Sequence, residues 1–113
     1  MGSIVINGCY GGFGISLKGI KKLWELSPED SIWNTTNFEI YYDQVYIPSE
    51  IRKKIRTDKY LISCIQKYGS KFMSGQCALL TVVHTDSSVV RIQETDGYES
   101  LEHFDEDNLY VLQ

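Results

Sequence analysis

The sequence predicts a single α+β domain in which two helices pack on a small, largely antiparallel sheet. One observation behind this prediction is the length, because 113 residues are close to the commonest size of one domain. Another is the order of the hydrophobic patterns, which runs strand, helix, an undecided extended region, helix, and then two or three strands. Helices and strands that occur in separate runs are typical of α+β proteins.

The first predicted elements are a buried strand and an amphipathic helix. Residues 4–6 are consecutive β-branched residues that end at Asn7, which indicates a short buried strand. Apolar residues then recur at helical spacing from Ser16 onward, with lysines on the other side. The helix ends before Pro28, because the residue preceding a proline disfavours the helical conformation. The positions expected to be buried are Leu17, Ile20, Leu23 and Trp24.

The second predicted helix follows a long segment of weak pattern, residues 27–57. Within that segment, residues 38–48 hold enough Ile, Tyr and Val for one strand or an irregular extended stretch. Thr57 or Asp58 then provides a side chain able to cap a helix N-terminus. Apolar residues follow at helical spacing toward Gly69. The residues expected to be buried are Leu61, Ile65 and Tyr68.

The last third of the sequence predicts antiparallel strands. Residues 77–85 and 89–94 are two β-rich runs separated by the turn-like residues 86–88, and we expect them to form a hairpin. Asp96-Gly97 predicts a second tight turn before residues 98–104. The acidic residues 105–108 are expected to be a solvated end.

Composition and charge restrict the classes of partner. The formal net charge is −4 and the main cationic cluster is confined to residues 52–59, which disfavours binding of duplex nucleic acid. The sequence contains no apolar run of about 20 residues and no signal-peptide pattern, so we expect a cytoplasmic protein without a membrane partner. The eight tyrosines favour a contact surface, either for a host protein or for a homo-oligomer.

The glycine-rich stretch after the first strand is the leading candidate for a binding site. A turn from strand to helix that is rich in glycine lets backbone amides approach an anion, and the helix dipole adds a favourable charge. The spacing matches neither a dinucleotide fingerprint nor a P-loop, and a purely structural turn is the competing interpretation. The predicted ligand-binding residues are Gly11, Gly12, Phe13, Gly14 and Ser16, with Lys18 or Arg56 as the counter-charge.

Cys9 suggests an alternative, a cysteine-dependent hydrolase. A thiol near a helix N-terminus can have a lowered pKa and act as a nucleophile, but it needs a base. His84 and His103 are the two histidines of the chain. The competing interpretation, which we favour, is that Cys9 is a small buried residue under the glycine stretch. Packing is also the expected role of Cys64 and Cys77, because the three cysteines have neither disulfide nor zinc spacing.

Two charged clusters complete the candidates. Arg52, Lys53, Lys54 and Arg56 precede the second helix and either hold a phosphate or carboxylate or form a solubilising loop. The carboxylates Glu94, Asp96 and Glu99 gather near one turn, but their spacing is not that of a calcium-binding loop, so an acidic turn without metal is expected. We expect no cofactor.

Several segments together resemble a set of small proteins from bacteriophages, bacteria and large DNA viruses that have no established activity. The run from Asn7 to Ser16 carries most of the resemblance, which continues at Arg56-Thr57-Asp58 with Leu61, at Cys77-Ala78 and at residues 96–99. Lys59 stands where these proteins often have proline, and residues 108–113 lack their usual terminal tryptophan. The resemblance implies a viral or phage setting and supplies no catalytic residue.

From these observations, the leading hypothesis is a non-catalytic binding protein that captures a small anionic ligand such as a nucleotide, in the manner of a viral accessory or anti-defence factor. The alternatives are the Cys9 hydrolase and a protein-interaction module that uses the tyrosines.

Overall fold

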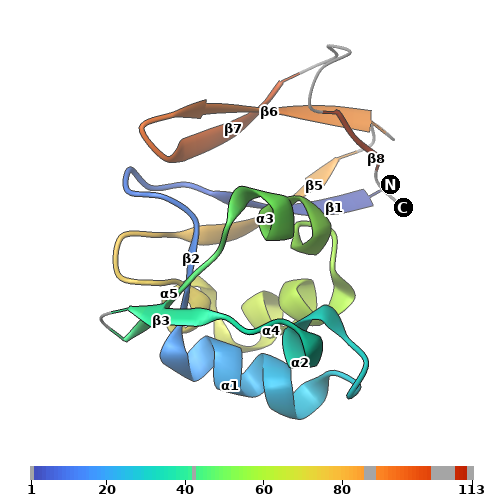
Figure 1. The fold of residues 1–113 in the computed structure, drawn as a ribbon. Helices are drawn as coiled ribbons and strands as arrows, with labels where there is room; N and C mark the ends of the chain where they lie inside the picture. The colour runs from blue at the N-terminus through green and yellow to red at the C-terminus, as the bar shows by residue number, and fades with distance from the viewer. Residues whose placement is uncertain (1, 42, 86–88, 103–108, 112–113) are drawn as a thin grey trace.

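Three layers make up the computed structural model, which describes residues 2–41, 43–85, 89–102 and 109–111 (Figure 1). A two-stranded antiparallel sheet, β1 (Gly2–Asn7) with β5 (Leu80–Thr85), lies in the middle. A three-stranded antiparallel sheet of order β7-β6-β8 covers one face of it, and most of the helices lie on the other side. The outer strands are β6 (Val89–Thr95), β7 (Tyr98–Glu102) and β8 (Leu109–Val111). The α+β class is confirmed.

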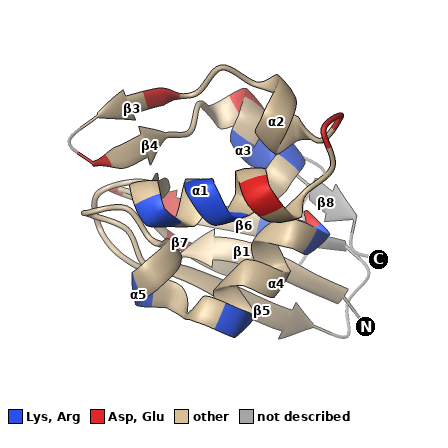
Figure 2. Cartoon of the chain, turned by 90° about the horizontal axis from the view of Figure 1, so that it is seen from below, with Lys and Arg blue, Asp and Glu red and all other residues tan. Residues whose placement is uncertain are grey.

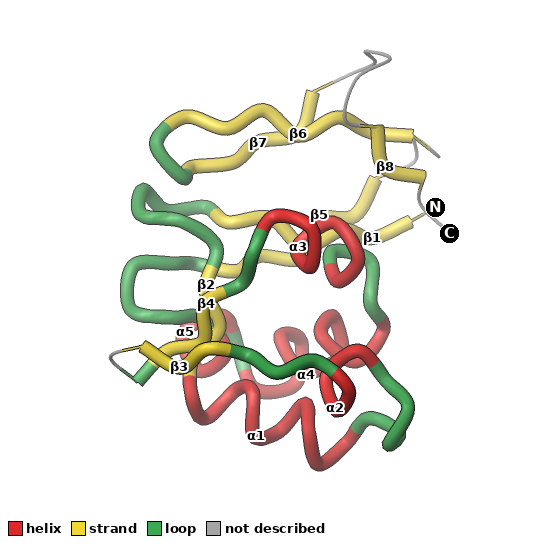
Figure 3. The backbone as a smooth tube through the Cα atoms, in the orientation of Figure 1, coloured by secondary structure: helices red, strands yellow, loops and turns green. Residues whose placement is uncertain are grey.

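The helical layer is larger than the sequence indicated. It contains α1 (Leu17–Leu26), α2 (Ile32–Thr35), α3 (Ser49–Ile55), α4 (Lys59–Tyr68) and α5 (Ser70–Met73). The two predicted helices correspond to α1 and α4, and the others are short segments with too few turns to give a clear hydrophobic period. Figure 3 shows α1, α2, α4 and α5 on one side of the β1–β5 pair, with α3 drawn at the level of the pair itself.

The central strand β1 has both faces covered. Val5 points into the main core among the helices, whereas Ile4 joins a small cluster with Val90 beneath the outer sheet. Because neighbouring side chains of a strand point to opposite faces, a strand buried on both sides reads as a continuous apolar run. This burial accounts for the consecutive β-branched residues 4–6.

The predicted hairpin between residues 77–85 and 89–94 is wrong. β5 pairs with β1, with Asn7 opposite Leu80 and Gly2 opposite Thr85, while β6 pairs with β7 and β8. The connecting residues 86–88 lie outside the described part of the chain. A turn-like cluster between two β-rich runs indicates a change of direction but does not specify pairing, and here the two runs joined different sheets.

The second predicted turn is confirmed. Asp96 and Gly97 join β6 to β7, with Thr95 opposite Tyr98. Both residues have positive φ angles, 50° and 90°, as a type I′ hairpin turn requires. The acidic residues 105–108 that were expected to form a solvated end lie outside the described residues.

Of the seven residues of α1 and α4 that were expected to be buried, four belong to the core, Leu17 and Tyr68 are only partly buried against it, and Trp24 is exposed. Ile20, Leu23, Leu61 and Ile65 are core residues, and Asp58 caps α4 by accepting hydrogen bonds from two backbone amides of its first turn. Trp24 is 37% exposed, because the neighbouring elements cover only part of the apolar face of α1. The largest buried side chain comes instead from α2: Trp33, whose indole nitrogen donates to Asp58.

Residues 38–48 form a hairpin of two short strands, β3 (Glu39–Tyr41) and β4 (Gln44–Tyr46), instead of one strand. The reversal is possible because Asp43 adopts a positive φ of 62°, which Asp tolerates better than most residues. A further strand, β2 (Gly14–Ser16), pairs with β4, so the sheet order is β2-β4-β3. None of the helices in the described residues has the length and apolarity needed to cross a membrane.

Candidate functional site

Residues 8–13 of the glycine stretch form a loop between β1 and β2 that packs against the β6–β7 turn. The Gly11 amide donates to the Asp96 carbonyl at 3.1 Å. A methyl group on Gly97 would collide with the backbone nitrogen of Gly12, and one on Gly11 would lie 2.6 Å from Cys77 Cβ. Gly11 and Gly97 are therefore required for close approach of backbones as well as for their positive φ angles.

This geometry differs from the strand-to-helix anion site expected from the sequence. The strand β2 separates the glycine loop from α1, so the loop amides and the helix N-terminus do not form one continuous turn. The Ser16 hydroxyl caps α1 by accepting from the Gly19 amide, and it donates to the Phe72 carbonyl. Lys18 is exposed on α1. Ser16 and Lys18 are thus apart from the pocket described below, and Ser16 has a structural role.

Arg56 is held in a buried ion pair with Glu99. The two guanidinium Nη atoms donate to the two carboxylate oxygens at 2.8 and 2.5 Å, and each residue is only 3% exposed. Arg56 also donates to the Val5 carbonyl at 3.0 Å, and Glu99 accepts from the Asn7 amide at 2.8 Å. The pair therefore joins the end of α3, the central strand β1 and the outer strand β7.

Asn7 extends this polar network into the glycine loop. Its side-chain amide donates to the carbonyls of Cys9 and Gly97, and its side-chain oxygen accepts from the Leu79 amide. Fully satisfied buried polar groups of this kind specify one arrangement of the backbone. The network fixes the position of the loop relative to both sheets.

The carboxylates near the β6–β7 turn do not form a metal site. Glu99 is turned inward to Arg56, whereas Glu94 and Asp96 are exposed. Within residues 2–41, 43–85, 89–102 and 109–111, no group of three His, Cys, Asp or Glu side chains is arranged to hold a metal ion.

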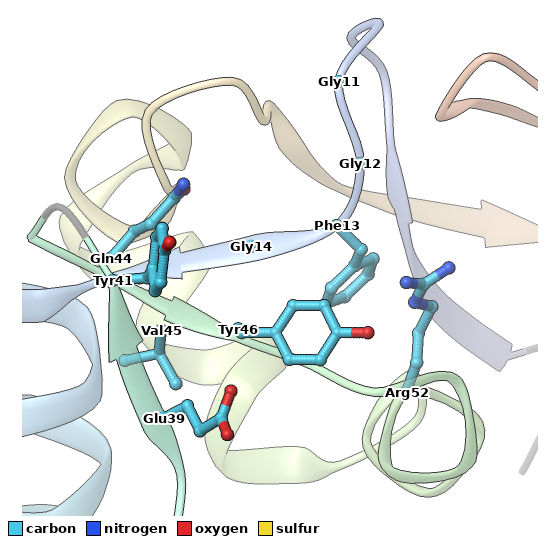
Figure 4. Close-up of a pocket in the computed structure, with 10 residues that line it drawn as sticks. All are labelled: Gly11, Gly12, Phe13, Gly14, Glu39, Tyr41, Gln44, Val45, Tyr46 and Arg52. Atoms are coloured by element: carbon cyan, nitrogen blue, oxygen red, sulfur yellow. The ribbon is translucent and has the colours of Figure 1, made fainter.

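A pocket of about 360 Å³ lies beside the glycine loop, and we call it the tyrosine pocket (Figure 4). The loop supplies one wall, the β3–β4 hairpin another, and α3 contributes one arginine. Its lining residues are Gly11, Gly12, Phe13, Gly14, Glu39, Tyr41, Gln44, Val45, Tyr46 and Arg52. Four of the predicted ligand-binding residues therefore line one cavity, while Ser16, Lys18 and Arg56 are not among its lining residues.

The tyrosine pocket combines aromatic rings with a cation. Phe13 is buried, and the Arg52 guanidinium carbon lies 5.7 Å from the centre of its ring. Tyr41 and Tyr46 are large exposed side chains, 63% and 56% accessible. Figure 4 shows the ring of Tyr46 beside that of Phe13, with Arg52 beyond them. This arrangement offers stacking surfaces and a positive charge to one ligand.

Arg52 retains hydrogen-bonding capacity. Its Nε is buried without a hydrogen-bond partner in the described residues, and an Nη atom makes one long hydrogen bond, 3.4 Å, to the Ile47 carbonyl. No described carboxylate forms an ion pair with it. A buried donor that lacks a partner costs free energy, so an anion accepting from it would be stabilised.

The structure does not bring Cys9 and His84 together. Cys9 belongs to the glycine loop, next to the Asn7–Leu80 end of the central pair, whereas His84 is opposite Ser3 and close enough for a 2.7 Å hydrogen bond to its hydroxyl. Four residues along a strand separate these positions by about 13 Å. His103, the other candidate base, lies outside the described residues.

The expected burial of the cysteines is confirmed only for Cys64. Cys64 belongs to the main core, and burial raises the pKa of its thiol, with a smaller contribution from the negative charge of Asp58. Cys9 is half-buried outside that core, and Cys77 is exposed, so packing in the core was a wrong prediction for both. Cys9 lies two residues after the end of β1, in the loop that leaves the central β1–β5 pair.

Sequence reasoning missed the contribution of the β3–β4 hairpin to the pocket. Glu39, Tyr41, Gln44 and Tyr46 come from a segment whose strand pairing the local pattern left undecided. The only available signal was the concentration of tyrosines in residues 41–46. Arg52 was named only as a member of the basic cluster, which proves to be largely the helix α3.

Comparison with known proteins adds no assignment to this geometry: no protein-family profile, curated protein or solved structure matches the chain.

Proposed function

We propose that the protein is a non-catalytic binding protein that captures a small anionic molecule with a planar ring, such as a nucleotide, in the tyrosine pocket. The observation that carries the proposal is the juxtaposition of Arg52, with an unsatisfied buried Nε, and the aromatic rings of Phe13 and Tyr46 in one cavity. Most small-molecule sites are concave and largely apolar, with a few polar groups that orient the ligand.

The planar part of the ligand stacks on Tyr46. Tyr46 has the exposed area for such a contact, and the neighbouring rings and Val45 exclude water from one side. Stacking of a base on an aromatic side chain contributes about 1–3 kcal/mol. Tyr41 and Gln44 line the same wall of the pocket and contact the edge of the ligand's ring.

The anionic part of the ligand binds at Arg52. Glu39, which also lines the pocket, repels an anion and therefore directs it toward the guanidinium. The glycine loop contributes by its shape: without side chains at residues 11, 12 and 14, the ligand can approach the backbone closely. Following the resemblance to phage and viral proteins, we propose that capture withholds the molecule from a host.

The test is a titration of the folded protein with AMP, a cyclic nucleotide and inorganic phosphate, followed by amide shifts in NMR and by calorimetry. We expect shifts at Gly12, Gly14 and Tyr46, and a loss of nucleotide affinity of about tenfold in Tyr46→Ala, equivalent to about 1.4 kcal/mol. Tyr10→Ala is the matched control, because Tyr10 is similarly exposed but its ring lies against that of Tyr98, outside the pocket. Unmoved pocket amides with every ligand at millimolar concentration would contradict the proposal.

A protein-interaction module is the second candidate, favoured by the exposure of Ile40, Tyr41 and Tyr46 on one hairpin. Among the described strands, β3 pairs only with β4, and an edge strand of this kind is able to pair with another chain. In this case sedimentation would show self-association that Ile40→Lys abolishes, while the same variant would leave small-molecule titrations unchanged.

A further inference from the structure

A second concave region, which we call the basic groove, also has Arg52 among its lining residues. It has a volume of about 350 Å³ and runs between α3 and the strands β6 and β7. Its lining residues are Ser49, Arg52, Lys53, Arg56, Arg91, Ile92, Gln93, Glu94 and Glu99. In contrast to the tyrosine pocket, the groove is lined almost entirely by polar and charged side chains.

The charges of the groove do not cancel. Arg56 and Glu99 neutralise each other in their buried pair. Among the other lining residues, Arg52 and Lys53 carry positive charges and Glu94 carries one negative charge. Figure 2 shows the basic residues of α3 in blue. A local excess of positive charge in a protein of net charge −4 makes this groove able to concentrate anions.

Arg52 connects the two cavities, because it lines both of them. Its guanidinium lies near the Phe13 ring on the pocket side, and Arg56 lies over the same ring, 5.1 Å from its centre. The Arg52 side chain therefore borders both cavities, and an anionic group held at Arg52 lies at the edge of the groove.

We propose that the basic groove is a phosphate-chain subsite and that the ligand class is the nucleoside polyphosphates, bound with the base in the tyrosine pocket. The placement of the base rests on the proposed function, whereas the placement of the phosphates rests only on the basic groove. Arg52 binds the phosphate nearest the nucleoside, and Lys53 binds the distal ones. The buried Arg56–Glu99 pair forms the floor of the groove. Because Arg56 is bound to Glu99, it is not expected to bind the phosphates.

The experiment compares calorimetric titrations with adenosine, AMP, ADP and pyrophosphate in the unmodified protein and in two charge-reversal variants. Lys53→Glu places a negative charge in the groove. Lys54→Glu is the matched control, since Lys54 is the next residue of α3, is exposed and lines neither cavity. Both changes alter the net charge equally, so a difference between them reports the groove itself. Circular dichroism verifies that both variants remain folded.

We expect ADP to bind more tightly than AMP, and Lys53→Glu to weaken ADP and pyrophosphate about tenfold, or about 1.4 kcal/mol, while leaving adenosine unchanged. Lys54→Glu should change each affinity less than about twofold, since an exposed charge outside the groove is screened by salt. Equal effects of the two reversals, or equal affinities for ADP and AMP, would overturn the inference.

The outcomes separate the two proposals. Nucleotide binding that depends on Tyr46 but not on Lys53 overturns the phosphate-chain subsite and leaves the proposed function standing. Pyrophosphate binding that depends on Lys53, without any contribution of Tyr46 to nucleotide affinity, overturns the tyrosine pocket and supports the groove. Absence of binding for every probe at millimolar concentration overturns both.

Discussion

The two faces of the central β1–β5 pair are covered in different ways. On the helical face, a large apolar cluster centred on residues such as Trp33, Leu61 and Ile65 fills the space. On the outer face, Ile4 and Val90 are the buried members of a much smaller cluster, and the Arg56–Glu99 pair connects the outer sheet to α3. Apolar burial stabilises without regard to direction, whereas a bidentate ion pair requires one geometry. The outer sheet is therefore positioned by specific polar contacts, and the basic groove lies where those contacts are.

The largest expected effect is at the ion pair. Glu99→Gln leaves the Arg56 guanidinium buried without its counter-charge, and we expect the free energy of unfolding to fall by about 3–5 kcal/mol. Urea denaturation monitored by circular dichroism measures this loss. The double variant Arg56→Leu with Glu99→Leu should recover most of it, because replacing both partners by apolar residues removes the buried charge. A single variant as stable as the unmodified protein would show that the outer sheet does not depend on the pair.

The corresponding measurement for the helical face is the loss of unfolding free energy when a core side chain is truncated. Ile65→Ala removes a buried side chain of α4, and we expect a loss of about 2–5 kcal/mol from transfer and cavity terms. Trp24→Ala on α1 is the contrast, since Trp24 is a partly exposed residue outside the core, and its loss should stay near 0.5 kcal/mol. If the two changes cost the same, the division between core and surface described for the helical layer is incorrect.

The contact between the glycine loop and the β6–β7 turn predicts unequal effects for two glycines. Both have a positive φ, but a Cβ on Gly97 meets the backbone of Gly11 and Gly12, whereas one on Gly12 meets open space. Gly12→Ala should therefore cost about 1–2 kcal/mol from the left-handed conformation alone, and Gly97→Ala should cost more. Thermal unfolding of both variants tests the order, and a reversed order would remove the argument that the loop is held by the turn.

The smallest expected effect is a pH dependence of the helical face. Burial raises the pKa of the Cys64 thiol, so the folded protein keeps this proton at a pH where the unfolded chain releases it. Its contribution to stability is present below the unfolded pKa of about 9.0 and decreases as the pH rises above it toward the folded pKa. Urea midpoints at about pH 7 and about pH 9.5 measure the decrease. The Cys64→Ala variant should show a smaller decrease in urea midpoint than the unmodified protein. An identical decrease in both proteins would exclude Cys64 as its source.

The agreement between sequence and structure follows the range of the interactions involved. Residues 4–6, the apolar faces of α1 and α4, the Asp58 cap and the Asp96-Gly97 turn depend on neighbours within a few positions, and these features were predicted. The partner of β5 and the path of residues 38–48 depend on distant segments, and local patterns did not specify them. The tyrosine pocket belongs to the second group because its walls come from three separate segments.

The sequence by itself determined that this protein is an α+β chain with two amphipathic helices, a buried first strand and a glycine-rich loop beside it. Tertiary structure decided the roles of the charged residues: it paired Arg56 with Glu99 across 43 positions and left Arg52 between two cavities. The physical reason is that hydrophobic periodicity and turn preferences are properties of a short stretch of chain. The availability of a charge for a ligand depends instead on which opposite charge the fold brings to it.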